Sequence, residues 1–248
     1  MAEAHVAAPE LPNIVSLVAH RFPSSGFSKF LLLWENVIFS LIIVGVISLV
    51  VYRAARKRTL IPGRLQCAVE LIVGTLDEFV CSILGAKGRT YVPFIGTLFI
   101  YIACMNLLGL VPFMKSPTAS LSTTAALAIC VFVYVQYSSM RELGFIGYVD
   151  HLMGNPRGII AFSVVVPLFM LVLHIISEVI RPVSLALRLR SNVWGDDMLI
   201  AMLSGLGLKG LPILLFSTLL VLVASLVQAF VFSLLTTVYF ALFLVHEE

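Results

Sequence analysis

Six charged side chains interrupt an otherwise apolar stretch of the sequence between residues 158 and 204. They are Glu178, Arg181, Arg188, Arg190, Asp196 and Asp197. An ionised side chain at bilayer depth costs at least about 3 kcal/mol on insertion scales, so it usually faces water, an opposite charge or a protein interior. Charges retained in such a segment indicate a functional site whose chemistry involves charged groups held at bilayer depth.

Helical spacing places several polar residues of this segment on one face. A series that recurs every four residues shares this face: Ser184, Arg188, Asn192 and Asp196. Arg181 lies near the same face, because it precedes Arg188 by seven residues. Arg190 points roughly to the opposite side.

Two explanations for these arginines remain open. An arginine near a helix end can reach the interface and pair with a local acid, which we expect for Arg181 beside Glu178. Arg190 fits either explanation. Arg188 has only Asp196 on its own face, two turns away, so we expect its partner on another chain.

The chain as a whole carries too little charge for a soluble protein. Of its 248 residues, 60% are hydrophobic and 12% are charged, whereas an ordinary soluble domain has about 25% charged residues. This composition excludes a typical soluble enzyme, a disordered chain and a nucleic-acid-binding protein. The four cysteines are widely separated and no phosphate-loop motif occurs, so we predict no metal site and no cofactor.

The apolar segments predict an all-α membrane protein with about five membrane crossings. The predicted spans are about 30–52, 91–114, 117–140, 158–204 and 211–245. Residues 63–84 predict an amphipathic helix, either on the membrane surface or packed beneath the spans. We expect residues 30–248 to form a single membrane domain after an extracytoplasmic segment, 1–29.

The last two spans are longer than the bilayer is thick. As one helix, 158–204 would extend about 70 Å against a hydrocarbon core of about 30 Å, so it must tilt, kink or break into two. Pro167 and Pro182 are candidate kink points. We therefore predict two overlong, oblique, antiparallel helices joined by the glycine-rich turn at 205–212.

Basic residues indicate the orientation of the chain. Seven of the 16 basic residues lie within 53–89, and the basic-rich side of a membrane protein is usually cytoplasmic. A loop is expected on this same side over 141–157. Five crossings then place the N-terminus outside and the C-terminus in the cytoplasm, as expected for a multi-pass protein of a bacterial inner membrane.

Several motifs occur in the order expected of one membrane protein family. Residues 181–192 read Arg-Pro-Val-Ser-Leu-Ala-Leu-Arg-Leu-Arg-Ser-Asn. This run resembles the signature of the membrane-embedded a subunit of F-type rotary ATP synthases. Further segments similar to that family are 106–112, 117–120 and 228–239. The resemblance covers nearly the whole chain from about residue 30, and the motif around Arg188 is its most specific part.

The resemblance implies a stator in the lipid membrane beside a rotating ring of c subunits, held by peripheral-stalk b subunits. It implies two half-channels for the ion, and no catalytic or nucleic-acid-binding role for this chain. Arg188 matches the family's indispensable arginine. As a ring carboxyl group passes, Arg188 would hold it in the charged form and release its ion.

The resemblance also assigns polar positions to the half-channels. Asn192, Asp197 and Gln228 match positions of the outer half-channel, Ser177 and Ser184 match positions of the cytoplasmic half-channel, and Tyr239 matches a tyrosine near the end of the last helix. For Gln228 the alternative is a hydrogen bond between the last two helices. For the two serines the alternative is a hydroxyl bonded to its own backbone one turn back.

Among the positions that depart from the family pattern, three bear on a titratable group. His174 replaces a common acid, and its ordinary pKa near neutrality suits proton passage in the cytoplasmic half-channel, although a neutral, hydrogen-bonded histidine is the alternative. Val221 lies where many members carry His or Glu, and Asp196 lies where Gly is frequent. We hypothesise that the titratable group has moved to Asp196, which then forms a coupled pair with Asp197.

Two other functions remain open at this point. A stand-alone proton-coupled membrane transporter would predict repeated halves with broken helices around a central site, and the sequence contains no evident repeat. A non-transporting membrane scaffold would use Arg188 only for structural pairing.

Overall fold

The computed structural model describes residues 30, 33–56, 63–111, 114–152 and 162–244, and every regular element within these residues is helical. The predicted all-α fold is therefore confirmed. The segment expected to be extracytoplasmic, 1–29, lies outside the described residues, as do 153–161 and the last four residues.

Six α-helices make up the described part of the chain. They are α3 (Glu35–Arg56), α4 (Arg64–Leu84), α5 (Val92–Leu108), α6 (Leu121–Leu152), α7 (Phe162–Ser204) and α8 (Leu211–Leu244). Three short 3₁₀ turns join some of them: η1 (Ala86–Thr90), η2 (Pro117–Ala119) and η3 (Gly207–Gly210). By length and hydropathy α3, α6, α7 and α8 are each sufficient to cross a membrane, and α5 is a shorter apolar helix of 17 residues. These five helices are consistent with about five crossings.

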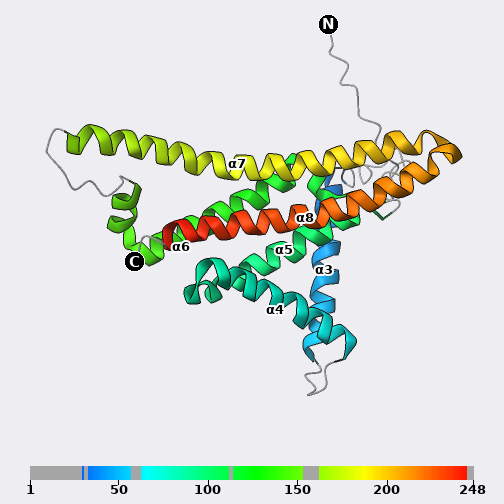
Figure 1. Cartoon of the computed structure of the whole chain (residues 1–248), viewed down its shortest axis with the longest axis horizontal. Coiled ribbons are helices and arrows are strands. Elements are labelled where there is room, and N and C mark those ends of the chain that lie inside the picture. Colours follow the sequence, from blue (N-terminus) through cyan, green and yellow to red (C-terminus); the bar gives the residue numbers. More distant parts are fainter. Residues whose placement is uncertain (1–29, 31–32, 57–62, 112–113, 153–161, 245–248) are drawn as a thin grey trace, which may run out of the picture.

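The two C-terminal helices form the long antiparallel pair that the sequence predicts. Helix α7 contains 43 residues and α8 contains 34, so they extend about 65 Å and 50 Å respectively. They run side by side across the molecule and are joined at one end by a turn in which Gly207 has a φ of 63° (Figure 1). Helix α7 continues through Pro182 without a break. Of the three alternatives for this overlong segment, which were a tilt, a kink or a break into two helices, the break is therefore excluded.

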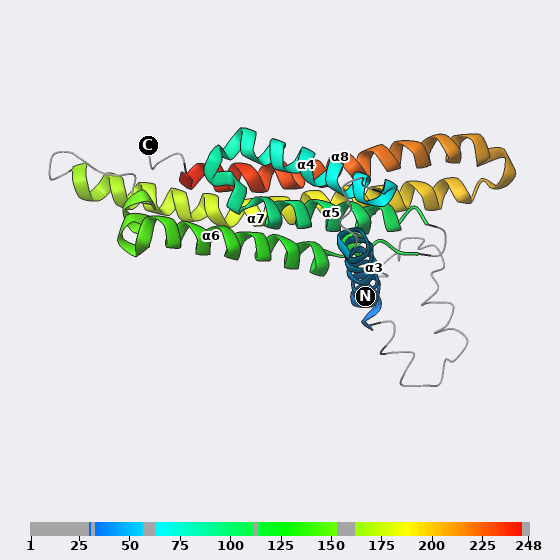
Figure 2. The same cartoon turned by 90° about the horizontal axis from the view of Figure 1, so that it is seen from below.

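Helices α4, α5 and α6 lie along the α7–α8 pair, whereas α3 crosses them. In Figure 2 α3 is seen nearly end-on, while the other five helices run across the view. The predicted amphipathic segment forms α4, which packs against α5 and α8 through buried Leu76 and Val80. Its opposite face is open, since Leu71 is 70% exposed.

Helix α6 differs from the prediction, because the segment expected to be a loop at 141–157 is helical as far as Leu152. The helical run contains one break, at Gly144, whose φ of 69° lies in the left-handed region. Glycine adopts this conformation without the steric cost that a Cβ atom imposes. The break lets the chain after Gly144 change direction while both halves remain helical.

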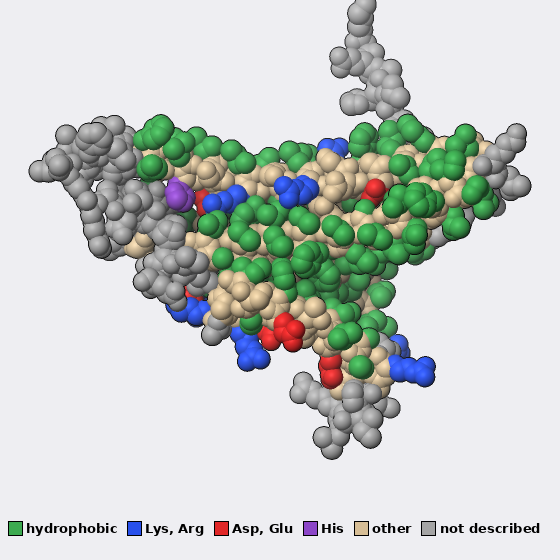
Figure 3. Space-filling view, viewed as in Figure 1, with side chains coloured by type: hydrophobic (Ala, Val, Ile, Leu, Met, Phe, Trp, Pro, Cys, Tyr) green, Lys and Arg blue, Asp and Glu red, His purple; other side chains and the backbone are tan. Residues whose placement is uncertain are grey.

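The core lies where α5, α6, α7 and α8 meet. Its fully buried side chains include Ile95, Ile102, Leu189, Phe232 and Phe240. The outside of the molecule is also apolar: in Figure 3 the face formed by α7 and α8 is mostly hydrophobic, with a few isolated charged groups along it. An apolar exterior is expected when lipid or other membrane subunits are the surroundings.

Candidate functional site

Arg188 lies on the open face of α7. Its side chain is exposed and lines a shallow groove with Ile180, Val183, Leu187 and two serines. The three apolar residues are 57%, 52% and 46% exposed respectively. No hydrogen bond or ion pair joins the Arg188 guanidinium to another of the described residues. Within the described residues, Arg188 is therefore a cation without an ion pair on a mostly apolar face.

Within the described residues, neither Ser177 nor Ser184 forms a hydrogen bond with Arg188. Ser177 and Ser184 are exposed, and neither hydroxyl forms a hydrogen bond within the described part of the chain. The backbone-bonded arrangement considered for them is therefore not formed. His174 is half-buried four residues before Glu178. Arg190 is half-buried and projects from another side of α7, two residues beyond Arg188.

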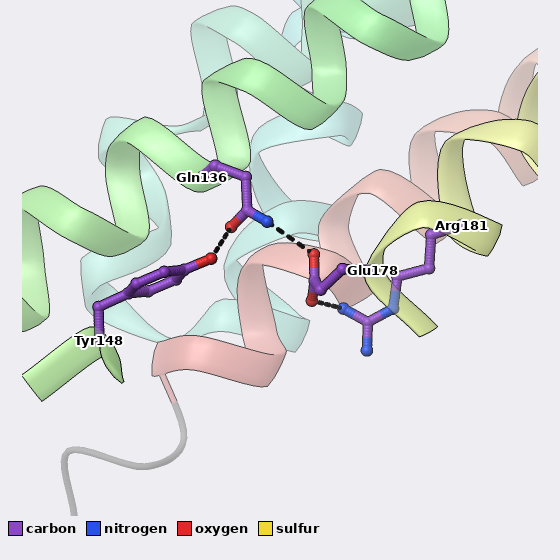
Figure 4. A network of polar contacts seen from close by, with 4 residues as sticks. All are labelled: Gln136, Tyr148, Glu178 and Arg181. Atoms are coloured by element: carbon purple, nitrogen blue, oxygen red, sulfur yellow. Dashed lines mark hydrogen bonds and ion pairs between the residues drawn. The ribbon is translucent and has the colours of Figure 1, made fainter. Parts of the chain in front are cut away.

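A charged cluster joins α6 to α7 on the N-terminal side of Arg188; we define it as Gln136, Tyr148, Glu178 and Arg181 (Figure 4). The Arg181 Nη1 donates to Glu178 Oε1 at 2.5 Å, and Gln136 Nε2 donates to Glu178 Oε2 at 3.0 Å. The Tyr148 hydroxyl in turn donates to Gln136 Oε1 at 3.0 Å. The predicted pairing of Arg181 with Glu178 is confirmed, and both oxygens of this carboxylate are used.

The break at Gly144 brings Tyr148 to Gln136, because it redirects the end of α6 back along the helix. Burial raises the pKa of the Tyr148 phenol, and the negative charge of Glu178 raises it further. The phenol is therefore held in its protonated form, which is the form that donates to Gln136.

Tyr239 of α8 completes the surroundings of the charged cluster. The Arg181 guanidinium lies over its ring, with 5.3 Å from Cζ to the ring centroid, a distance typical of a cation–π contact. A small pocket between α6, α7 and α8 is lined by Glu178, Arg181, Pro182 and Tyr239 together with apolar residues. Tyr239 therefore contacts the charged cluster through the Arg181 guanidinium.

An amide cluster lies on the other side of Arg188; we define it as Asn106, Ser116, Thr118, Asn192 and Gln228. Asn192 Nδ2 donates to Gln228 Oε1 at 2.7 Å, which links α7 to α8. The interhelical hydrogen bond considered for Gln228 is therefore present. One turn earlier on α8, the Ser225 carbonyl accepts a hydrogen bond from Asn106 Nδ2 at 3.3 Å.

The remaining members of the amide cluster form a buried chain of hydroxyls. Thr118 Oγ1 donates to Asn106 Oδ1 at 2.8 Å and lies 2.6 Å from Ser116 Oγ. The Ser116 hydroxyl donates to the Met105 carbonyl at 2.9 Å. Asn106, Ser116 and Thr118 are all buried, at 3%, 0% and 0% exposure. The side chains of these three buried residues are thus joined to one another and to backbone carbonyls by hydrogen bonds between neutral groups.

The two adjacent acids of α7 lie beside the amide cluster. Asp197 Oδ1 lies 3.7 Å from the position that a Cβ would occupy on Gly109, so this carboxylate reaches the connector between α5 and η2. Asp196 is half-buried one turn beyond Asn192. Val221, where the family pattern suggests a titratable group, is buried in α8 at 8% exposure.

Sequence reasoning did not predict that Gln136 and Tyr148 belong to the charged cluster, or that Ser116 and Thr118 belong to the amide cluster. A signal existed for Gln136, which is a lone amide within a charge-free apolar span and therefore needs a partner. No comparable signal marks Tyr148, because its place depends on the backbone at Gly144. Ser116 and Thr118 flank a proline in a connector, where hydroxyl groups are ordinary.

Comparisons with known proteins show which family this chain resembles. A family described as ATP synthase A chain matches residues 37–241. ATP synthase subunit a of Protochlamydia amoebophila is 44% identical over 249 aligned residues, which cover 97% of this chain and 91% of the relative. Subunit a of Oleidesulfovibrio alaskensis is 37% identical, covering 83% of this chain and 84% of that one. Subunit a of Solidesulfovibrio magneticus is 37% identical, and the alignment covers 92% of this chain and 94% of that relative.

Proposed function

The chain belongs to the ATP synthase A chain family, and on this premise we propose that it is the stator ion channel of a rotary ATP synthase. It is a multi-pass membrane protein and a component of the membrane part of that complex. The finer proposal is that Arg188 and two half-channels drive ion translocation against a ring of c subunits. The observation that carries it is the exposed guanidinium of Arg188 on the apolar face of α7, which forms no ion pair with another described residue.

A ring carboxyl group explains why such a cation would be retained. The carboxyl group can face lipid only when neutral, because ionisation there costs several kcal/mol of desolvation. Beside Arg188 its anion gains an opposite charge, so it gives up its ion at this position. A guanidinium suits the role because it stays protonated at any accessible pH and therefore does not carry the proton itself. An ion that crosses 100 mV releases about 2.3 kcal/mol, which biases the rotation.

We place the two half-channels on opposite sides of Arg188. The outer half-channel uses Asn192, Asp196, Asp197 and Gln228, and support for it comes from the hydrogen bond between the two amides and the position of both acids beside them. The cytoplasmic half-channel uses His174, Ser177 and Ser184, with Tyr239 near its end. The exposed hydroxyls of the two serines support this assignment, since both are available to water.

The partners and the location follow from the same proposal. The exposed apolar residues around Arg188 would contact the outer helices of the c ring, and peripheral-stalk b subunits would hold the chain against rotation. The membrane is a bacterial inner membrane, with the N-terminus outside and the C-terminus in the cytoplasm. This chain is non-catalytic in the proposal, and ATP chemistry takes place on other subunits.

The direct test replaces Arg188 with Ala or Lys in the assembled complex. ATP-driven acidification of inverted membrane vesicles should be abolished by both changes, because neither residue reproduces the planar, permanently charged guanidinium. Arg190→Ala is the matched control, since Arg190 projects from another side of α7, and it should retain most of the pumping. Retained pumping in an assembled Arg188→Ala complex would show that the proposal is wrong.

The hypothesis about Asp196 has its own test. Asp196→Asn keeps the shape of the side chain and removes its titration, so pumping should fall while Asp197 is still present. Adding Val221→Glu should restore part of the pumping, because it returns a titratable group to α8. Full pumping in Asp196→Asn would contradict the hypothesis and leave the role of Arg188 untouched.

Co-purification separates this proposal from a stand-alone transporter. The stator proposal requires that small helical-hairpin subunits and the soluble ATPase subunits purify with this chain in mild detergent. Ion transport by the isolated chain in lipid vesicles, without those subunits, would favour the stand-alone transporter instead.

A further inference from the structure

The two arginines near the open face of α7 differ in their surroundings. Arg181 and Arg188 are seven residues apart, which is about 10 Å along the helix axis. Arg181 forms an ion pair with Glu178, and its guanidinium also contacts the Tyr239 ring. Arg188 has no ion pair within the described residues. One of two neighbouring cations is therefore neutralised and the other is left open.

Glu178 is held in place for this pairing by a second helix. Its Oε1 accepts from Arg181 and its Oε2 accepts from Gln136 of α6. The side chains of the ion pair remain partly accessible, at 25% exposure for Arg181 and 17% for Glu178. The net charge of the pair is zero at a position only two turns from Arg188.

We propose that Glu178 is a positioning residue that masks the charge of Arg181, so that α7 presents a single open cation to each passing carboxyl group. This inference rests on the proposed function, because it requires a ring carboxyl group that ionises beside Arg188. Arg190 does not compete, since it projects from another side of the helix. Masking would define one stopping point for the carboxylate instead of two.

The cost of losing the mask can be estimated. Arginine stays protonated in proteins, so without Glu178 the Arg181 cation would remain about 10 Å from Arg188. A unit charge at that distance, with an effective dielectric constant of about 20, shifts an ionisation equilibrium by about tenfold. The ring carboxyl group would then ionise over a longer part of its path and be retained there, which slows each step.

The test measures ATP-driven proton pumping by the complete ATP synthase in inverted membrane vesicles. Glu178→Gln keeps the size of the side chain and the contact with Gln136, and removes only the charge. It should lower pumping about tenfold at equal amounts of assembled complex. The double variant Glu178→Gln with Arg181→Gln removes both charges, and pumping should return to within about twofold of the parent, because the two effects cancel.

A purely structural role for the charged cluster predicts the opposite pattern. Under that role the double variant would pump no better than Glu178→Gln. Gln136→Leu, which breaks the contact between α6 and α7 but keeps the ion pair, would be as damaging. Either result would overturn masking. If Glu178→Gln fails to assemble, the other two variants decide alone: masking requires that both pump within about twofold of the parent.

Arg188→Ala separates this inference from the proposed function. Retained pumping in Arg188→Ala would remove the basis of both. Loss of pumping in Arg188→Ala together with normal pumping in Glu178→Gln would overturn masking alone.

Discussion

The charged cluster and the amide cluster lie on opposite sides of Arg188 along α7, and they satisfy their polar groups by different means. The charged cluster uses an ion pair with a hydrogen-bonded amide and phenol. The amide cluster uses amides, hydroxyls and backbone carbonyls, and its most buried members are almost fully enclosed. The charged cluster contains ionised side chains that remain partly accessible. The buried members of the amide cluster are all neutral.

This difference follows from the energetics of burial. A neutral polar group can be fully buried if each of its hydrogen bonds is made, whereas a buried ion pair often fails to recover its desolvation energy. The charged cluster should therefore contribute mainly to the charge pattern of α7, and the amide cluster mainly to the packing of α5, α7, α8 and η2. Variants in the two clusters should separate stability from pumping.

The largest effect on stability is expected for Asn106→Leu in the amide cluster. The change leaves the Ser225 carbonyl without its side-chain donor and removes the acceptor of the Thr118 hydroxyl. The Ser225 carbonyl keeps its hydrogen bond within α8, so the Thr118 hydroxyl is the group that loses its acceptor, and the loss should be about 1–3 kcal/mol. This loss of stability can be measured as the amount of folded protein retained in membranes and as the midpoint of thermal inactivation. A greater loss from Gln136→Leu would reverse the contrast between the clusters.

A smaller loss is expected for Gly144→Ala, which affects the charged cluster through the backbone. A Cβ atom in the left-handed conformation costs about 1–2 kcal/mol, and it should move Tyr148 away from Gln136. Gly45→Ala in α3 is the matched control, because an added Cβ there meets nothing within 4 Å. The control should be neutral or stabilising in the same thermal assay. Equal losses of stability in Gly144→Ala and Gly45→Ala would mean that the left-handed conformation at Gly144 does not cause the loss.

Gln228→Leu tests the link between α7 and α8. The hydrogen bond from Asn192 is lost, and interhelical hydrogen bonds in membranes contribute about 0.6 kcal/mol on average. Stability should therefore change little while pumping falls clearly. Gln228→Glu retains an acceptor for Asn192 and should keep more of the pumping. If the two variants pumped equally, the amide link would have no part in translocation.

A small effect is expected for Tyr148→Phe, which removes one donor from the charged cluster. Because the pKa of this phenol is raised in the folded protein, its stabilising contribution is present below about pH 10, the ordinary value, and is lost as the pH rises through the raised value. At neutral pH the variant should lose about 0.5–1 kcal/mol. When thermal inactivation is measured from pH 7 to 11, the stability of the variant should fall less at alkaline pH than the stability of the parent.

Much of the fold could be predicted because it depends on the composition of long segments. The apolar runs identify the long helices and the α7–α8 pair, and helical spacing places Arg181 beside Glu178. The helical end of α6 was not predicted, because Gly144 does not reveal in sequence whether its φ is positive. The residues around a glycine can be helical on both sides of a single left-handed position.

The site was only partly predictable for a related reason. The hydrogen bond between Asn192 and Gln228 follows from two polar residues on helices that must pack together. The contacts of Asn106 with Ser225 and Thr118 depend on how the connector before α6 folds back, and spacing along the chain does not contain that information. For Ser177 and Ser184 the sequence left open a bond to the backbone of their own helix, and the structure shows both side chains exposed without that bond.

The pairing of Arg181 with Glu178, three positions earlier, has a consequence for the synthesis and membrane insertion of the protein. The partner of Arg181 emerges from the ribosome before Arg181 itself, and one helical turn is enough to bring them together. This charge is therefore compensated as α7 enters the membrane, whereas under the proposed function Arg188 gains its partner only from a chain made separately. A newly inserted copy would remain incomplete until it meets that chain, and such an orphan is the form that membrane quality-control proteases should remove first.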